Sequence, residues 1–183
     1  MKYKIGFALL LPDSLNNLIR DVELTVSDVL DNQQGLRQPP HITVKRPFEV
    51  SSRELLVQLD KMLHEFSDFY SSPSLKYGMT CDFRKTSLVL LMDDPDPVEM
   101  LHVRLLEIFS KFSVLPDKFE GDNFIPHTTV AMGLNSANIH QANEILAQSK
   151  LPATEFTPTH LAILIFTDNH WVTYSMHALS DAK

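Results

Sequence analysis

The sequence lacks the marks of several large protein classes. Its single cysteine, Cys81, excludes an intrachain disulfide, and no cysteine cluster indicates a zinc site. No apolar run is long enough to cross a bilayer, and neither a low-complexity tract nor an obvious interdomain linker interrupts the chain. Positive charge is also scarce, with a formal net charge of −7. This charge argues against a tight, general nucleic-acid binder but permits a local basic pocket for one phosphate.

The first residues resemble a signal peptide, because two lysines precede the apolar run from Ile5 to Leu11. That run is short, and Pro12-Asp13-Ser14 follows where a small-residue cleavage site would stand. We therefore expect a buried first strand at residues 3–11 and a cytoplasmic protein with no membrane partner. The composition is that of a globular protein, and nothing in it indicates an obligate protein partner, so we expect a monomer.

Apolar residues at helical spacing predict four helices. The first begins at Asp13 or Ser14 and ends near Asp31-Asn32, and the second opens at the capping-box pattern of Ser51 and Glu54. The third begins at Asp96-Pro97, and the fourth covers residues 136–149. Further strands are expected at residues 41–48, 75–83, 86–92, 124–132, 160–167 and 170–179.

One short motif occurs twice. Residues 40–44 read Pro-His-Ile-Thr-Val and residues 126–130 read Pro-His-Thr-Thr-Val, so four of the five positions are identical at an offset of 86 residues. The same offset carries Leu75 to Leu161, and both halves share the order strand, helix, His-strand, helix and strand pair. We predict a single bilobal α+β domain over residues 1–183. It would have two pseudo-symmetric lobes of antiparallel-rich sheet, outer helices and a central groove that carries both His-x-Thr motifs.

The repeated residues suit acid–base chemistry. Side chains alternate along a strand, so His41 and Thr43 share one face about 6–7 Å apart, and His127 and Thr129 repeat this pattern. A neutral imidazole can accept a proton while a protonated one donates, which would serve a reaction at phosphorus. The threonine hydroxyls can bind the non-bridging phosphate oxygens.

The same alternation places Lys45 on the groove face, where its ammonium would hold an anionic substrate, while Arg46 would point away unless a bulge intervenes. The alternative for both cations is solvated charge at the edge of a sheet. Three further histidines, His64, His102 and His140, fall on predicted helices and are expected at the surface or its boundary.

The tetrads His-Ile-Thr-Val at 41–44 and His-Thr-Thr-Val at 127–130 resemble the signature of the 2H phosphoesterase superfamily, which includes the 2′-5′ RNA ligase family of bacterial RNA 2′,3′-cyclic phosphodiesterases. The resemblance implies an enzyme of RNA processing that needs no metal or cofactor and opens 2′,3′-cyclic phosphates, at RNA ends or in small nucleotides, to 2′-phosphates. It also implies that His41 and His127 are catalytic and that Thr43 and Thr129 bind substrate, without saying which histidine is the base.

Two other hypotheses remain. The first is a catalytically silent module of the same fold that binds nucleotides or RNA ends, which would not need two proton carriers. The second is a metal-dependent hydrolase with both histidines as ligands, although the sequence has no H-E-x-x-H or carboxylate-rich pattern. The acidic net charge favours a short oligonucleotide terminus or a small metabolite over long RNA.

Overall fold

The strands form one antiparallel sheet. The computed structural model describes residues 2–149, 151 and 153–180, and within them eight strands are ordered β6-β3-β4-β5-β2-β1-β7-β8. All neighbouring strands pair antiparallel. The strands are β1 (Tyr3–Leu10), β2 (His41–Val50), β3 (Leu75–Phe83), β4 (Ser87–Met92), β5 (His127–Met132), β6 (Glu155–Phe156), β7 (His160–Thr167) and β8 (His170–Ala178). The helices are α1 (Asp13–Leu30), α2 (Arg53–Ser67), α3 (Asp96–Ser110) and α4 (Asn138–Gln148), with 3₁₀ turns η1 (Gly35–Arg37) and η2 (Gly121–Asn123).

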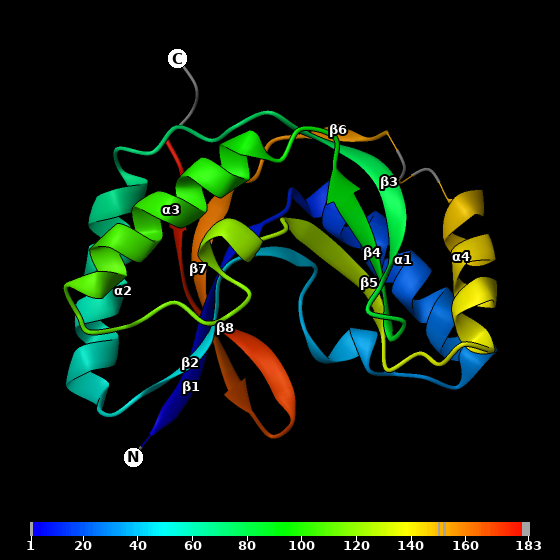
Figure 1. The fold of residues 1–183 in the computed structure, drawn as a ribbon, viewed down its shortest axis with the longest axis horizontal. Coiled ribbons are helices and arrows are strands. Elements are labelled where there is room, and N and C mark those ends of the chain that lie inside the picture. Colours follow the sequence, from blue (N-terminus) through cyan, green and yellow to red (C-terminus); the bar gives the residue numbers. More distant parts are fainter. Residues whose placement is uncertain (1, 150, 152, 181–183) are drawn as a thin grey trace.

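The strand order is symmetric about its centre, which confirms the predicted fold class. The two His-strands, β2 and β5, lie side by side, and the series β5-β4-β3 is matched by β2-β1-β7. We call β1, β2, β7 and β8 the first lobe, which lies to the left in Figure 1, and β3 to β6 the second lobe. Strands β3 and β7, related by the 86-residue offset, hold equivalent places in the two lobes.

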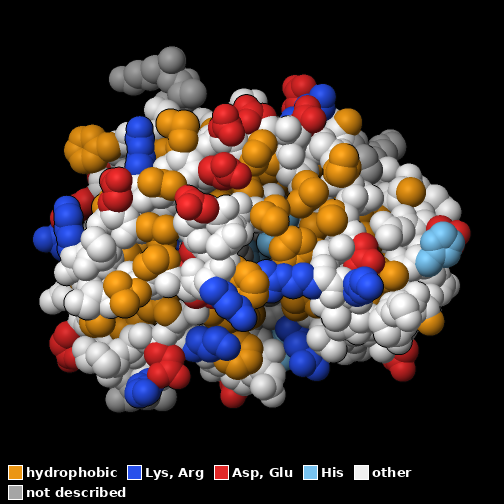
Figure 2. Space-filling view, viewed as in Figure 1, with side chains coloured by type: hydrophobic (Ala, Val, Ile, Leu, Met, Phe, Trp, Pro, Cys, Tyr) orange, Lys and Arg blue, Asp and Glu red, His pale blue; other side chains and the backbone are white. Residues whose placement is uncertain are grey.

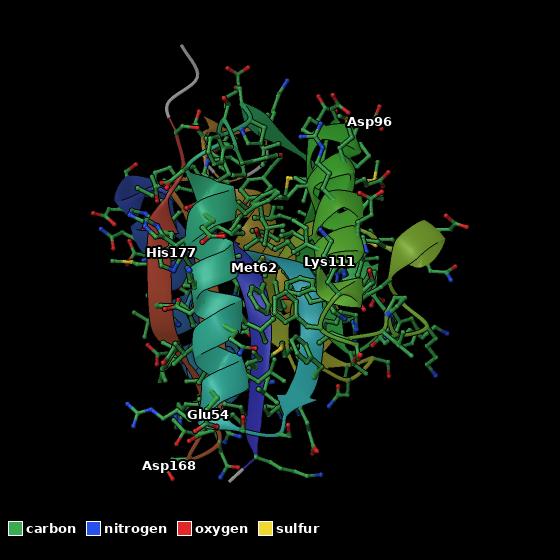
Figure 3. All side chains as sticks on the ribbon, turned by 90° about the vertical axis from the view of Figure 1, so that its left-hand side faces the viewer. Glu54, Met62, Asp96, Lys111, Asp168 and His177 are labelled. Carbon is green, nitrogen blue, oxygen red and sulfur yellow. The ribbon has the colours of Figure 1, made fainter. Side chains whose placement is uncertain are left out.

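The two sequence halves interlock instead of forming one lobe each. Helices α2 and α3 pack against strands of the first lobe, and α1 and α4 pack against each other and against β5 and β4 of the second. Helix α1 follows β1 of the first lobe, and α3 follows β4 of the second, so each crosses to the opposite lobe (Figure 1). Figure 3 shows α2 and α3 covering the sheet on the outer side of the first lobe.

Local chemistry explains where the elements begin. The side chain of Ser52, not the expected Ser51, caps α2 by accepting a hydrogen bond from the backbone N–H of Leu55 at 3.2 Å. Strand β5 begins at His127 and not at Phe124, because Pro126 has no N–H to give to a ladder. The turns η1 and η2 and the two-residue strand β6 have no predicted counterpart.

The inner face of the sheet forms the core. Ile42, Val44, Thr128 and Val130 are all buried there, as strand alternation predicts. The one polar member, Thr128, accepts a hydrogen bond from the hydroxyl of Tyr77 at 2.8 Å, so its oxygen is satisfied away from water. None of the helices described combines the length and the apolar character that crossing a membrane requires.

Candidate active site

The two His-strands meet at a single residue pair, Ile42 with Thr128. In an antiparallel register this pair sets His41 opposite Thr129 and Thr43 opposite His127. Because Ile42 and Thr128 point into the core, their four neighbours point to the other face. The register therefore gathers both copies of the motif into one group.

The four side chains line one cleft of about 260 Å³. Its other lining residues come from both lobes and from the segments before β2 and β5: Gln38, Arg46, Pro47, Phe83, Arg84, Phe119, Asn123, Phe124, Ile125 and Met132. Figure 2 shows this face hollowed near its centre, with Lys and Arg side chains gathered beside and below the hollow. The expected convergence of the two imidazoles on one groove is thus present in the geometry.

Each imidazole is held in the same tautomer. His41 donates its Nδ1–H to the carbonyl of Pro39, and His127 donates its Nδ1–H to the carbonyl of Ile125, both at 2.7 Å. A carbonyl can only accept, so Nδ1 carries the proton and Nε2 is left as the basic nitrogen. Both carbonyls belong to a residue that precedes a proline, a position restricted to extended backbone. The repeated prolines therefore help to fix the ring orientation.

Both histidines favour their neutral form. Burial is the largest cause that lowers the pKa of His41, and a charge on His127 lowers it further, against the raising effect of the Pro39 carbonyl. Burial also lowers the pKa of His127, and the guanidinium groups of Arg46 and Arg84 add to that effect. The Nε2 of His41 lies 3.1 Å from Thr43 Oγ1, so the hydroxyl donates to the neutral ring.

The expected orientation of the Lys45 side chain toward the cleft is wrong, because a β-bulge interrupts the alternation, although Lys45 lines a smaller hollow together with His41 and Thr43. Phe7 of β1 pairs with Lys45 and Ala8 pairs with Thr43, so Val44 is an extra residue in β2. The bulge turns the Lys45 side chain inward, where it is 2% exposed, and turns Arg46 toward the cleft. Strand β5 has the same shift at Val130. Two adjacent apolar residues, Val130 and Ala131, interrupt the alternation of polar and apolar residues in β5. This pair is the feature of the sequence that could have indicated a bulge.

The buried Lys45 anchors the loop before β5. Its Nζ lies 2.6 Å from Oε2 of Glu120, which is also buried. The same carboxylate accepts hydrogen bonds from the backbone N–H of Arg46 at 2.7 Å and of Asp117 at 2.8 Å. The Lys45 ammonium is therefore already paired with the Glu120 carboxylate. A substrate phosphate could bind Lys45 only by displacing that carboxylate.

His102 braces the same loop and is buried at 1% exposure, so its expected surface position is wrong. Its Nδ1–H donates to the carbonyl of the bulged Val44 at 2.8 Å, and its Nε2 accepts from the backbone N–H of Gly121 at 3.0 Å. The ring stacks on Phe124 with centroids 3.9 Å apart. Burial lowers the pKa of His102, which suits the accepting role of Nε2.

Sequence reasoning missed a cluster of cations and rings at one mouth of the cleft. The guanidinium of Arg84 lies 3.7 Å from the ring centroid of Phe119, and that of Arg46 lies 4.9 Å from it. The ring of Phe83 lies 4.8 Å from that of His127. These residues come from the β3–β4 turn, from β2 and from the loop after α3, so only the fold brings them together. Within the described part of the chain, no group of three or more His, Cys, Asp or Glu side chains could hold a metal ion.

The fold matches that of several solved structures. A structure described as a phosphoesterase aligns at 16% identity with a TM-score of 0.68, over 99% of this chain and all of the other. LigT of E. coli in complex with 3′-AMP gives the same values. TT0787 of Thermus thermophilus aligns at 12% identity with a TM-score of 0.65, over 98% of this chain and all of that one. At such identities the likeness concerns the fold alone.

The family follows from the sequence itself. The model of the 2′-5′ RNA ligase superfamily matches residues 11–170, which include both motifs. The chain therefore belongs to the 2′-5′ RNA ligase superfamily. A search of curated proteins found no match.

The buried ion pair gives a stability prediction. Lys45→Met leaves the Glu120 carboxylate buried without its partner, so we expect the free energy of unfolding to fall by about 3–5 kcal/mol. The double variant Lys45→Met/Glu120→Gln removes both charges and should recover much of this loss. Urea denaturation measures both. Lys2→Met, which breaks the exposed pair with Glu49, is the control and should change the midpoint little. A Lys45→Met protein as stable as the wild type would contradict the anchoring role.

Proposed function

We propose that the protein is a phosphodiesterase that opens 2′,3′-cyclic phosphates to 2′-phosphates without a metal ion, with His41 and His127 as its proton carriers. The observation that carries this proposal is the pair of imidazoles in one cleft, each with Nδ1–H bound to a carbonyl so that Nε2 is the basic nitrogen. A binding module would not need two such groups. The lone Cys81 fits a cytoplasmic location, where thiols stay reduced.

The reaction needs one proton removed and one supplied. With the cyclic phosphate between the two rings, the neutral Nε2 of one histidine takes a proton from water as the water oxygen attacks phosphorus. The bond from phosphorus to the 3′ oxygen breaks, and the protonated Nε2 of the other histidine gives that oxygen a proton. The products are a 2′-phosphate and a free 3′ hydroxyl.

Thr43 and Thr129 each lie opposite a histidine of the neighbouring strand, and their hydroxyls suit the non-bridging oxygens of the phosphate, where negative charge grows in the transition state. Arg46 and Arg84, which line the same cleft, supply positive charge on one side of it. The alternative, a nucleotide-binding module without turnover, would use the same cleft and differs from an enzyme in releasing no product.

Likeness to ligand-bound structures supports a nucleotide-sized substrate. Solved structures of E. coli LigT hold 3′-AMP, NADP+, phosphate and ATP, and they share this fold over at least 98% of the present chain. Phosphate groups are common to all four ligands. This agrees with the chemistry proposed for the cleft.

Removing either imidazole should remove the activity. We expect His41→Ala and His127→Ala each to lower kcat for adenosine 2′,3′-cyclic phosphate by about 10²–10⁴-fold, because each variant loses one proton carrier. His140→Ala, on the exposed side of α4, is the control and should behave as the wild type. Full activity in either active-site variant would rule out the paired mechanism, and loss of wild-type activity in EDTA would favour a metal-dependent one.

The pH dependence should be a bell shifted to acid. The base must be neutral and the acid protonated in the free enzyme, and the pKa of each histidine lies below the ordinary value of about 6.5. The maximum of kcat/KM should therefore fall below pH 6.5, with a decline on both sides. A profile that is flat from pH 5 to 8, or that still rises above pH 7, would contradict this assignment.

Two threonines on neighbouring strands give a matched pair. Thr43→Val should fold normally but lose phosphate contacts, so kcat/KM should fall by about tenfold or more with little change in the urea midpoint. Thr128→Val, on the core face, should instead lose about 1–3 kcal/mol of stability because it leaves the buried Tyr77 hydroxyl without its acceptor. Unchanged turnover in Thr43→Val would take Thr43 out of the site.

A further inference from the structure

The turn between β3 and β4 has an unusual backbone at the mouth of the cleft. Arg84 and Lys85 both have positive φ, 56° and 60°, and the N–H of Thr86 closes the turn on the carbonyl of Phe83. This tight hairpin geometry normally selects Asn, Asp or Gly at both central positions, because long side chains are disfavoured there. The β7–β8 turn obeys that preference with Asp168 and Asn169. Strain of this kind is often retained at functional sites.

The strained turn presents the Arg84 guanidinium to the cleft. Its carbon lies 3.7 Å from the centroid of Phe119 and 5.0 Å from that of Phe83. Such contacts use the face of the guanidinium, and the N–H donors around its edge remain. In the described residues, no carboxylate or carbonyl accepts from Arg84. The edge donors are therefore available to an anion.

This guanidinium lies near one of the two histidines. The ring of Phe83 contacts both groups, with its centroid 5.0 Å from the Arg84 guanidinium carbon and 4.8 Å from the centroid of the His127 ring. The charges of Arg84 and Arg46 both lower the pKa of His127, which agrees with their closeness. Arg84 therefore lines the same cleft as His127, with Phe83 in contact with both residues.

Arg46 completes the mouth from the other lobe. The bulge in β2 places its guanidinium 4.9 Å from the Phe119 centroid, and its Nε donates to Oδ2 of Asp117 at 2.8 Å. Lys118 adds a third cation, 4.9 Å from the same ring centroid. Three cations therefore gather around the Phe119 ring, in a protein whose net charge is −7.

The geometry points to a second phosphate subsite formed by Arg84 and Arg46 around Phe119, which binds the phosphate that joins a terminal cyclic nucleotide to the rest of an RNA chain. This inference rests on the proposed function and makes the substrate an RNA end and not a free cyclic mononucleotide. Arginine is well suited to the role, since it can stack on a ring and bind a phosphate by its edge at the same time.

The test compares three substrates: adenosine 2′,3′-cyclic phosphate, its 5′-phosphorylated form, and the dinucleotide ApA with a terminal 2′,3′-cyclic phosphate. We expect the wild type to have a kcat/KM about tenfold or more higher for the dinucleotide than for the plain mononucleotide. The 5′-phosphorylated form should recover most of this gain because it carries the same phosphate. Equal kcat/KM values for all three substrates would overturn the subsite. A higher kcat/KM for the dinucleotide alone would also overturn it, because the preference would then come from base stacking and not from phosphate binding.

Two variants of the turn locate the effect. Arg84→Asn removes the guanidinium but suits positive φ, so it should fold at least as well as the wild type while the dinucleotide preference drops toward one. Lys85→Asn removes a charge from the adjacent position, which does not line the cleft, and should keep the preference within about twofold. The ratio of the two kcat/KM values cancels any change in the pKa of His127, since both substrates share it. A preference that survives in Arg84→Asn would refute the assignment.

Failure of the reaction itself is distinguishable. If none of the cyclic phosphates is opened, the proposed function is wrong, and calorimetry still decides the subsite. ApA 3′-phosphate should then bind more tightly than adenosine 3′-phosphate in the wild type but not in Arg84→Asn. Equal affinities in the wild type would overturn the subsite as well.

Discussion

The pairing of Ile42 with Thr128 is the constraint on which the site depends. This ladder pair joins the two lobes at their His-strands. A slip of one residue in either strand would turn that strand's imidazole and hydroxyl into the core and bring core residues out. The register is stabilised on the core face of the sheet, where Ile42, Val44 and Val130 are buried and Thr128 binds the Tyr77 hydroxyl. Packing on one face thus positions the polar groups on the other.

The paired bulges give each His-strand two uses. Before the bulge, the strand contributes its His and Thr to the cleft. After the bulge, residues 86 positions apart, Arg46 and Met132, face the same cleft, because the extra residue resets the alternation. In β2 the inward residue is Lys45, whose bond to Glu120 holds the loop that carries Phe119. The bulge in β2 therefore positions Arg46 in the cleft and also fixes the loop at the rim of the cleft.

Periodicity and repetition in the sequence were enough to predict the helices, seven of the strands and the convergence of the two motifs on one groove, but not that the two His-strands pair with each other in one sheet. They work because alternation and helical spacing are local rules that burial enforces. Lys45 was misplaced because the bulge depends on the register with β1. His102 was misjudged because its partners, Val44 and Gly121, are distant in sequence. The crossing of α1 and α3 to opposite lobes, and the gathering of Arg84 and Phe119, are likewise products of tertiary structure.

The symmetry of the cleft raises a question of direction. Two equivalent histidines could act on a symmetric phosphate in either order, so something unequal must orient the substrate. The inequality lies in the cleft-facing residue beyond each bulge, which is Arg46 in one strand and Met132 in the other. Arg84 lies on the same side as Arg46, and both favour the neutral form of His127 but are not among the causes that shift His41. An RNA chain whose phosphates bind these arginines would enter the cleft in only one orientation. That orientation would make one histidine the base and the other the acid, although their side chains are identical.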